Sequence, residues 1–109
     1  MSLNEAAESI SKWAMQQPSI MRLWFFGSRV KGDVRPSSDL DVAIELVRPP
    51  VQGVDESGGT ASWFMIEQVW REELSNIVGF TVDLQLYDSQ LTLNVMQYVA
   101  KSGLLIYER

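Results

Sequence analysis

The chain has 109 residues, 46% of them hydrophobic, and carries a net charge of −5 with neither cysteine nor histidine. This length supports one hydrophobic core, so we expect a single domain spanning 1–109, and the missing residue types exclude disulfides, thiol nucleophiles and histidine-based zinc sites or general bases. Because no apolar run approaches the roughly 18 residues of a membrane helix and the negative charge opposes a broad basic footprint, we expect a cytoplasmic protein that contacts neither membranes nor nucleic acid directly.

The first quarter of the chain predicts a helix followed by a strand. Ser2 and Glu5 have the spacing of a capping box, and apolar residues then recur at helical spacing until Pro18. The β-prone segment 20–26 stops at Gly27, so we expect a strand there.

A second strand is predicted over 39–46, where apolar and polar residues alternate. The apolar residues are on one face, and Asp39, Asp41, Ala43 and Glu45 are on the other. Glu45 is interpreted as a solvated residue. The segment 47–60 is rich in glycine and proline and is expected to be an internal loop.

The last half predicts helix, strand, helix and a short extended end. A helical apolar stripe runs over 61–78 and ends before Gly79, and an alternating strand over 80–87 has Asp83 on its polar face. Ser89 is a candidate cap for a helix running to about residue 101, followed by Gly103 and the extended residues 104–107. This order predicts an α/β fold.

Two aspartates open the second strand and face the same way. Asp39 and Asp41 are separated by about 6.6 Å along a strand, and two adjacent carboxylates repel each other unless a cation lies between them. Asp83, on the matching face of the third strand, offers another carboxylate and a base for an acceptor proton. An oxygen-only ligand set favours Mg²⁺ or Mn²⁺, and such clusters suit two-ion phosphoryl chemistry.

A glycine and a serine precede this carboxylate strand, at the end of the first strand. Gly27 and Ser28 can present backbone N–H groups and a hydroxyl to a phosphate. Three of the nine basic residues, Arg29, Lys31 and Arg35, fall within seven positions of one another beside this turn. We expect them to neutralise phosphate charge.

Gly27-Ser28, ten residues and then Asp39-Leu40-Asp41 resemble the G-S-x10-D-x-D signature of the nucleotidyltransferase superfamily. The flanking segments "FFGSRVKGDVRPSSDLDVAI", "TVDLQLYD" and "VAKSGLLIYER" are similar to the minimal nucleotidyltransferases. This resemblance implies a mixed β-sheet with helices packed on one face and the carboxylate-bearing face open. It also implies transfer of a nucleoside monophosphate, with AMP from ATP as our expectation, to a hydroxyl, and release of pyrophosphate.

The resemblance implies a set of site residues, a metal and a partner. Asp39, Asp41 and Asp83 would be the catalytic carboxylates and the ligands of two Mg²⁺ ions, for which Mn²⁺ could substitute. Gly27 and Ser28 would bind the nucleotide, as would Arg29 by similarity and Lys31 and Arg35 by charge alone. Many minimal nucleotidyltransferases act as antitoxins of a HEPN protein, so a cognate HEPN-like partner is expected, in a homo- or hetero-oligomer.

Other interpretations of these residues stay open at this point. The aspartates could form a solvated strand face, Gly27 could serve only a tight turn, and the basic residues could be simple surface charges. Trp63 and Trp70 are assigned to the core, with a partner surface as the alternative. The function could be partner binding without catalysis, or nucleotidyl transfer to an aminoglycoside-like alcohol.

Overall fold

The computed structural model describes residues 2–27, 30, 39–47, 58–88 and 92–109, and of residues 58–62 it describes the backbone only. In chain order the elements are α1 (Leu3–Met15), β1 (Ile20–Phe26), β2 (Leu40–Leu46), α2 (Gly58–Val78), β3 (Val82–Leu86), α3 (Leu93–Ser102) and β4 (Leu104–Glu108). The predicted order of helices and strands is therefore confirmed. None of these described helices combines the length and the apolarity needed to cross a membrane.

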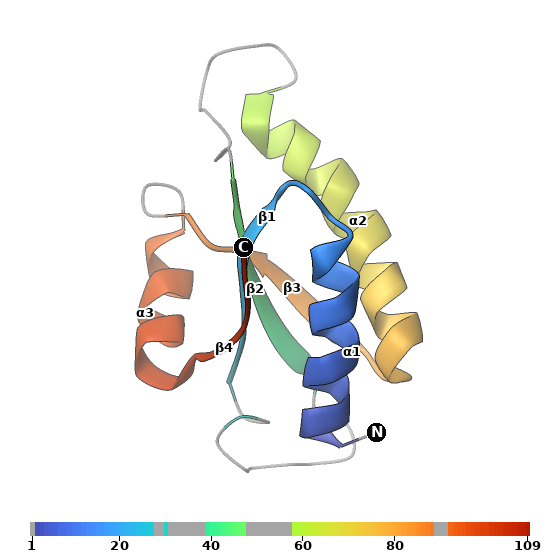
Figure 1. The fold of residues 1–109 in the computed structure, drawn as a ribbon. Helices are drawn as coiled ribbons and strands as arrows, with labels where there is room; N and C mark the ends of the chain where they lie inside the picture. The colour runs from blue at the N-terminus through green and yellow to red at the C-terminus, as the bar shows by residue number, and fades with distance from the viewer. Residues whose placement is uncertain (1, 28–29, 31–38, 48–57, 89–91) are drawn as a thin grey trace.

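The four strands form one mixed sheet in the order β3-β2-β1-β4. The central strand β1 is antiparallel to both of its neighbours, β2 and β4, whereas β2 and β3 are parallel. In Figure 1, α1 and α2 cover one face of this sheet and α3 lies against the opposite face. We call these the core face and the pocket face.

The first helix begins where the capping box predicts. The backbone N–H of Glu5 donates to Ser2 Oγ at 3.1 Å, and the backbone N–H of Ser2 donates to Glu5 Oε1 at 3.2 Å. Two backbone donors that the helix cannot satisfy itself thus gain partners. The predicted capping box is confirmed.

The core face carries most of the buried apolar side chains, and three tryptophans close it. Trp70 lies edge-on to Trp13 and to Trp63, with ring centroids 5.5 Å and 6.3 Å apart. All three rings are buried, and Trp13 Nε1 donates to Glu73 Oε2 at 2.8 Å. Such edge-to-face contacts add to the free energy gained by burial. The assignment of Trp63 and Trp70 to the core is confirmed.

The pocket face is not left wholly open, which refines the expectation that helices pack on one face only. Val95 and Val99 of α3 are buried against Phe26 and Ala43, which form a small apolar area in the middle of the pocket face. Because Ala43 has a small side chain, the helix can approach the sheet at this point. α3 therefore covers part of the face that bears the aspartates (Figure 1).

Other expectations need correction at the ends of elements. α2 begins at Gly58, inside the expected loop, and β3 is shorter than expected at both ends. The N-cap of α3 is Thr92, three residues after the expected Ser89, which lies outside the described residues. The backbone N–H of Asp88 donates a hydrogen bond to the Thr92 hydroxyl oxygen at 2.7 Å. This bond lies in the turn before α3, and the Thr92 side chain makes no capping hydrogen bond to the helix itself.

Glu45 is not a simple solvated residue, so that interpretation is wrong. Arg22 Nη1 donates to Glu45 Oε1 at 2.6 Å, and Arg22 Nε donates to Glu108 Oε2 at 2.6 Å. These ion pairs join the neighbouring strands β2, β1 and β4. They lie at the end of β1 opposite to Phe26 and Gly27.

Candidate functional site

The sheet register brings two of the predicted carboxylates together. Asp41 of β2 and Asp83 of β3 are direct partners in the parallel pair, so their Cα atoms belong to adjacent strands about 4.8 Å apart. Both side chains are partly exposed on the pocket face. Asp39 lies two residues earlier, at the exposed residue before β2.

The proximity of these carboxylates changes the acidity of Asp41. Burial, charge repulsion by Asp83, a hydrogen bond shared with Asp83 and repulsion by Asp39 together raise the pKa of Asp41 to about 6. Within the described residues, no lysine or arginine forms an ion pair with Asp41 or Asp83. The pKa of Asp41 is therefore raised first by burial of its carboxyl group and then by the neighbouring carboxylates of Asp83 and Asp39.

Gly27 lies directly against Asp41. Its φ is +80°, a conformation that residues with a side chain rarely adopt. A Cβ at this position would overlap Asp41 Oδ2 and would lie 3.0 Å from Asp41 Cγ. Glycine is therefore required both by the backbone conformation and by the close approach to the carboxylate.

The end of α3 holds Gly27 in this position. The backbone N–H of Gly27 donates to Ser102 Oγ at 3.3 Å, and the Ser102 hydroxyl donates to the carbonyl oxygen of Tyr98 at 3.2 Å. Tyr98 also packs parallel to Phe26, with ring centroids 6.4 Å apart. These contacts connect α3 to the end of β1 at Gly27. The Gly27 N–H is engaged by Ser102, whereas the sequence predicts that it faces a phosphate.

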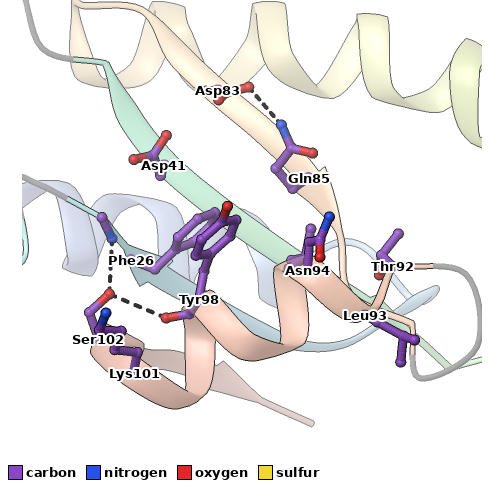
Figure 2. Close-up of a pocket in the computed structure, with 12 residues that line it drawn as sticks. Phe26, Asp41, Asp83, Gln85, Thr92, Leu93, Asn94, Tyr98, Lys101 and Ser102 are labelled. Atoms are coloured by element: carbon purple, nitrogen blue, oxygen red, sulfur yellow. Dashed lines mark hydrogen bonds between the residues drawn. The ribbon is translucent and has the colours of Figure 1, made fainter.

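A pocket of about 910 Å³ lies between α3 and the pocket face of the sheet. Figure 2 shows Asp41 and Asp83 on the sheet side and the side chains of α3 on the other. The volume is within the range of small-molecule and cofactor sites. The lining residues are Phe26, Gly27, Asp41, Asp83, Gln85, Thr92, Leu93, Asn94, Val95, Tyr98, Lys101 and Ser102.

The predicted site residues divide into three groups. Gly27, Asp41 and Asp83 line the pocket, whereas the neighbouring Asp39 does not line it. The other predicted nucleotide-binding residues, Ser28, Arg29, Lys31 and Arg35, lie outside the described residues. Their roles stay predictions.

The residues that line the pocket but were not predicted as site residues are Phe26 of β1, Gln85 of β3, Thr92 before α3 and the six pocket residues of α3. Gln85 could have been found, because strand alternation places it on the face of Asp83, and its Nε2 donates to Asp83 Oδ1 at 3.0 Å. The α3 residues gave no comparable signal. The helical period does not tell which face of the sheet a helix covers.

The carboxylates fit a magnesium ion by their chemistry. Asp41 and Asp83 present carboxylate oxygens side by side on adjacent strands, and oxygen atoms of this kind are the ligands that Mg²⁺ prefers. In the described part of the chain, no three acidic side chains are already gathered as a metal site. Asp39 or a substrate phosphate could supply a further oxygen ligand, and water would fill the remaining positions of the six-coordinate shell that magnesium prefers.

Comparison with known proteins identifies the type of domain. The family described as Polymerase beta, Nucleotidyltransferase matches residues 8–109, which is most of the chain. No curated protein matches the sequence significantly.

Several solved structures share this fold. A chain in a toxin–antitoxin structure with AMP-PNP superposes with a TM-score of 0.66 at 22% identity, covering 98% of this chain and 75% of that one. A chain of the toxin–antitoxin MntA–HepT gives 0.59 at 19% identity, covering 95% and 71%. A complex of tri-AMPylated HEPN toxin with MNT antitoxin, from Shewanella oneidensis, gives 0.59 at 18% identity, covering 100% and 74%.

Proposed function

Because the chain belongs to the polymerase β type of nucleotidyltransferases, we propose that it transfers AMP from ATP to a hydroxyl on a partner protein, in a Mg²⁺-dependent reaction. One observation carries this proposal. The pocket that is large enough for a nucleotide has the adjacent carboxylates of Asp41 and Asp83 on its wall, directly beside Gly27. Non-enzymatic binding of a partner would not require such a costly charge arrangement.

The reaction follows from the roles that these residues can take. The acceptor oxygen attacks the α-phosphorus of ATP, the bond from that phosphorus to the bridging oxygen breaks, and pyrophosphate leaves. Asp83 is the candidate base for the acceptor proton, and the Gln85 amide orients its carboxylate by donating to Oδ1. Gly27 lets the strand end approach Asp41 closely.

Asp41 and Asp83, with Asp39, are the residues that would hold magnesium. The bound ion supplies charge neutralisation at the phosphate oxygens and orients the triphosphate. Two ions are the number that we propose, with Mn²⁺ as a substitute. The turn residues Ser28, Arg29, Lys31 and Arg35 are proposed to contact the phosphates, in keeping with their spacing beside Gly27.

The proposed partner is a cognate HEPN toxin, and the proposed acceptor is a tyrosine hydroxyl on it. Support comes from the similar folds, which are found in toxin–antitoxin complexes and in a complex that contains a tri-AMPylated HEPN toxin. The rim of the pocket fits an acceptor supplied from outside, since Leu93 and Tyr98 there are well exposed. We propose that the chain acts as the antitoxin, as a single domain of 1–109.

Mass spectrometry of a co-expressed partner tests this function. The chain is produced together with its proposed HEPN partner, and the intact mass of that partner is measured. We expect additions of one or more AMP groups with the wild type and none with Asp41→Asn. The control is Glu72→Gln, an equivalent loss of one charge at an exposed position on α2, which should behave like the wild type. If both variants neutralise the toxin equally and no mass is added, the chain is a binding module without transferase activity.

A further inference from the structure

Three residues with a hydroxyl group line the pocket, and the hydroxyls of two of them are held by hydrogen bonds within the protein. The Thr92 hydroxyl accepts from the backbone N–H of Asp88 at 2.7 Å and donates to the Asp88 carbonyl oxygen at 3.1 Å. The Ser102 hydroxyl accepts from the Gly27 N–H and donates to the carbonyl oxygen of Tyr98. Both of these side chains would have to break their bonds before they could react.

The third hydroxyl, that of Tyr98, is in a different state. In the part of the chain that the structure describes, it makes no hydrogen bond to another residue. Tyr98 is also 56% exposed, so a ligand that enters the pocket can reach it. Tyrosine oxygen is one of the side-chain nucleophiles that form covalent bonds to substrates in enzymes. Of the pocket hydroxyls, that of Tyr98 is therefore the one most available to attack a bound phosphate.

The Tyr98 side chain points toward the carboxylates. Figure 2 shows it extending from α3 to the strands that carry Asp41 and Asp83, with the hydroxyl oxygen at the end nearer to the sheet. The ring lies parallel to that of Phe26, with an angle of 4° between the planes and 6.4 Å between the centroids. This contact sets the direction of the hydroxyl before any ligand binds. An acceptor oxygen and its candidate base, Asp83, are thus present in one pocket of one chain.

We propose that Tyr98 is a second acceptor of the transferase reaction, so that the chain adenylylates itself on this residue. The proposal rests on the proposed nucleotidyltransferase function and adds a modification site on the chain itself. The Tyr98 oxygen forms a bond to the α-phosphorus of ATP, the bond from that phosphorus to the bridging oxygen breaks, and pyrophosphate leaves. The phenol proton passes to Asp83. The product is a phosphodiester between the Tyr98 oxygen and AMP, which lies in the pocket.

The other two of the chain's three tyrosines are not placed for this reaction. Tyr87 is partly buried against Trp24, with ring centroids 4.3 Å apart, and Tyr107 is partly buried against the cluster on the core face. Neither of them lines the pocket. Modification should therefore be confined to Tyr98, and Tyr87→Phe and Tyr107→Phe are matched controls.

Mass spectrometry of the purified chain, incubated with ATP and Mg²⁺ in the absence of any partner, tests this site. We expect the intact mass of the wild type to increase by one AMP, and fragmentation of its peptides to place that AMP on Tyr98. Tyr98→Phe and Asp41→Asn should gain no AMP, whereas Tyr87→Phe and Tyr107→Phe should gain it like the wild type. Circular dichroism checks that Tyr98→Phe, which keeps the ring and its packing, is folded.

A mixing experiment tests whether the reaction takes place within one pocket. Isotopically heavy Asp41→Asn, which retains Tyr98, is incubated with an equal amount of light wild type, ATP and Mg²⁺. We expect AMP on the light chain alone, because Tyr98 reacts with ATP held by the carboxylates of its own chain. AMP on the heavy chain would overturn transfer within one pocket.

The proposed HEPN partner separates failure of this site from failure of the transferase. If the partner gains AMP while the wild-type chain, tested alone, gains none, self-modification is overturned and the transferase proposal stands. AMP on a residue other than Tyr98, or on Tyr98→Phe in the same amount as on the wild type, would also overturn the site. No AMP on either protein would overturn both proposals.

Discussion

The two faces of the sheet differ in what they are built to do. The core face is covered by α1 and α2 and closed by three buried tryptophans, with Phe25, Leu23 and Ile44 fully buried beneath them. On the pocket face, Phe26, Ala43, Val95 and Val99 form a small buried cluster, and Trp24 and Tyr87 pack against it. Beside this cluster lie the carboxylates and polar groups that line the pocket. Stability and chemistry are therefore carried by opposite sides of the same strands.

The largest expected effect comes from breaking the core face. Phe25→Ala should lower the free energy of unfolding by about 3–5 kcal/mol, since a fully buried aromatic ring is replaced by a cavity. Val99→Ala on the pocket face removes two buried methyl groups and should cost about 1.5 kcal/mol. Urea unfolding monitored by circular dichroism measures both. Similar losses for the two variants would contradict the division between the faces.

Two glycines with the same backbone conformation provide a matched test of the site. Gly27 and Gly79 both have φ of +80°, but an added Cβ would overlap Asp41 at Gly27 and would meet nothing within 4 Å at Gly79. Gly79→Ala should lose about 1–2 kcal/mol of stability from its backbone conformation and keep its activity. Gly27→Ala should lose more stability and also its transferase activity. Equal stability losses with activity retained in both variants would show that Gly27 serves only a turn.

In the absence of metal, the ionised Asp41 carboxylate beside Asp83 should lower the free energy of unfolding of the wild type relative to that of Asp41→Asn. Asp41 holds a proton more tightly in the folded state, with its pKa raised to about 6, than in the unfolded chain. The folded protein is therefore penalised as the pH rises from about 4 to about 6, and the penalty is complete above that. Asp41→Asn should raise the melting temperature of metal-free protein at pH 7.5, and this gain should disappear near pH 3.5.

With magnesium present, the wild type should have a higher melting temperature than Asp41→Asn, the reverse of the order expected without metal. Added Mg²⁺ is expected to raise the melting temperature of the wild type and to change that of Asp41→Asn little, because binding to the folded state alone stabilises it. The exposed variant Glu72→Gln should follow the wild type throughout. A wild type that is more stable than Asp41→Asn at pH 7.5 without metal would show that the repulsion at Asp41 is already compensated.

The smallest loss of stability is expected for a substitution at Arg22, which lies on β1 at the end away from Gly27. Arg22→Met removes both ion pairs with Glu45 and Glu108, which are partly exposed and therefore screened by water and salt. The variant should lose a little stability at low salt, less than Val99→Ala does, and this loss should shrink in high salt. A large loss that does not depend on salt would mean that the ion pairs hold β4 in place.

The sequence was sufficient for most of the elements and for part of the site. Alternation along 39–46 and 80–87 predicted which face each aspartate occupies, because side-chain direction in a strand depends only on local geometry. It did not predict that Asp41 and Asp83 are partners, since that follows from the parallel register of two strands distant in sequence. The capping box at Ser2 was predictable for the same reason as the alternation: all of its contacts are local.

The helical periodicity of the sequence could not predict which face of the sheet α3 covers. Its buried residues Val95 and Val99 show that one side of the helix packs, but they do not choose between two faces of a sheet that both offer apolar contacts. The choice depends on Ala43 and Phe26, which lie far away in the chain. Every pocket residue on α3 was therefore missed, whereas those on the strands were within reach.

Transfer of label from ATP tests the central claim most directly. The purified chain and its proposed HEPN partner are incubated with Mg²⁺ and with ATP labelled at either the α- or the γ-phosphate, using wild type and Asp41→Asn. The account predicts that label from the α-phosphate alone becomes bound to the partner, that it requires Mg²⁺, and that Asp41→Asn abolishes it. Transfer of the γ-label, or equal transfer by Asp41→Asn, would contradict nucleotidyl transfer at the Asp41–Asp83 pair.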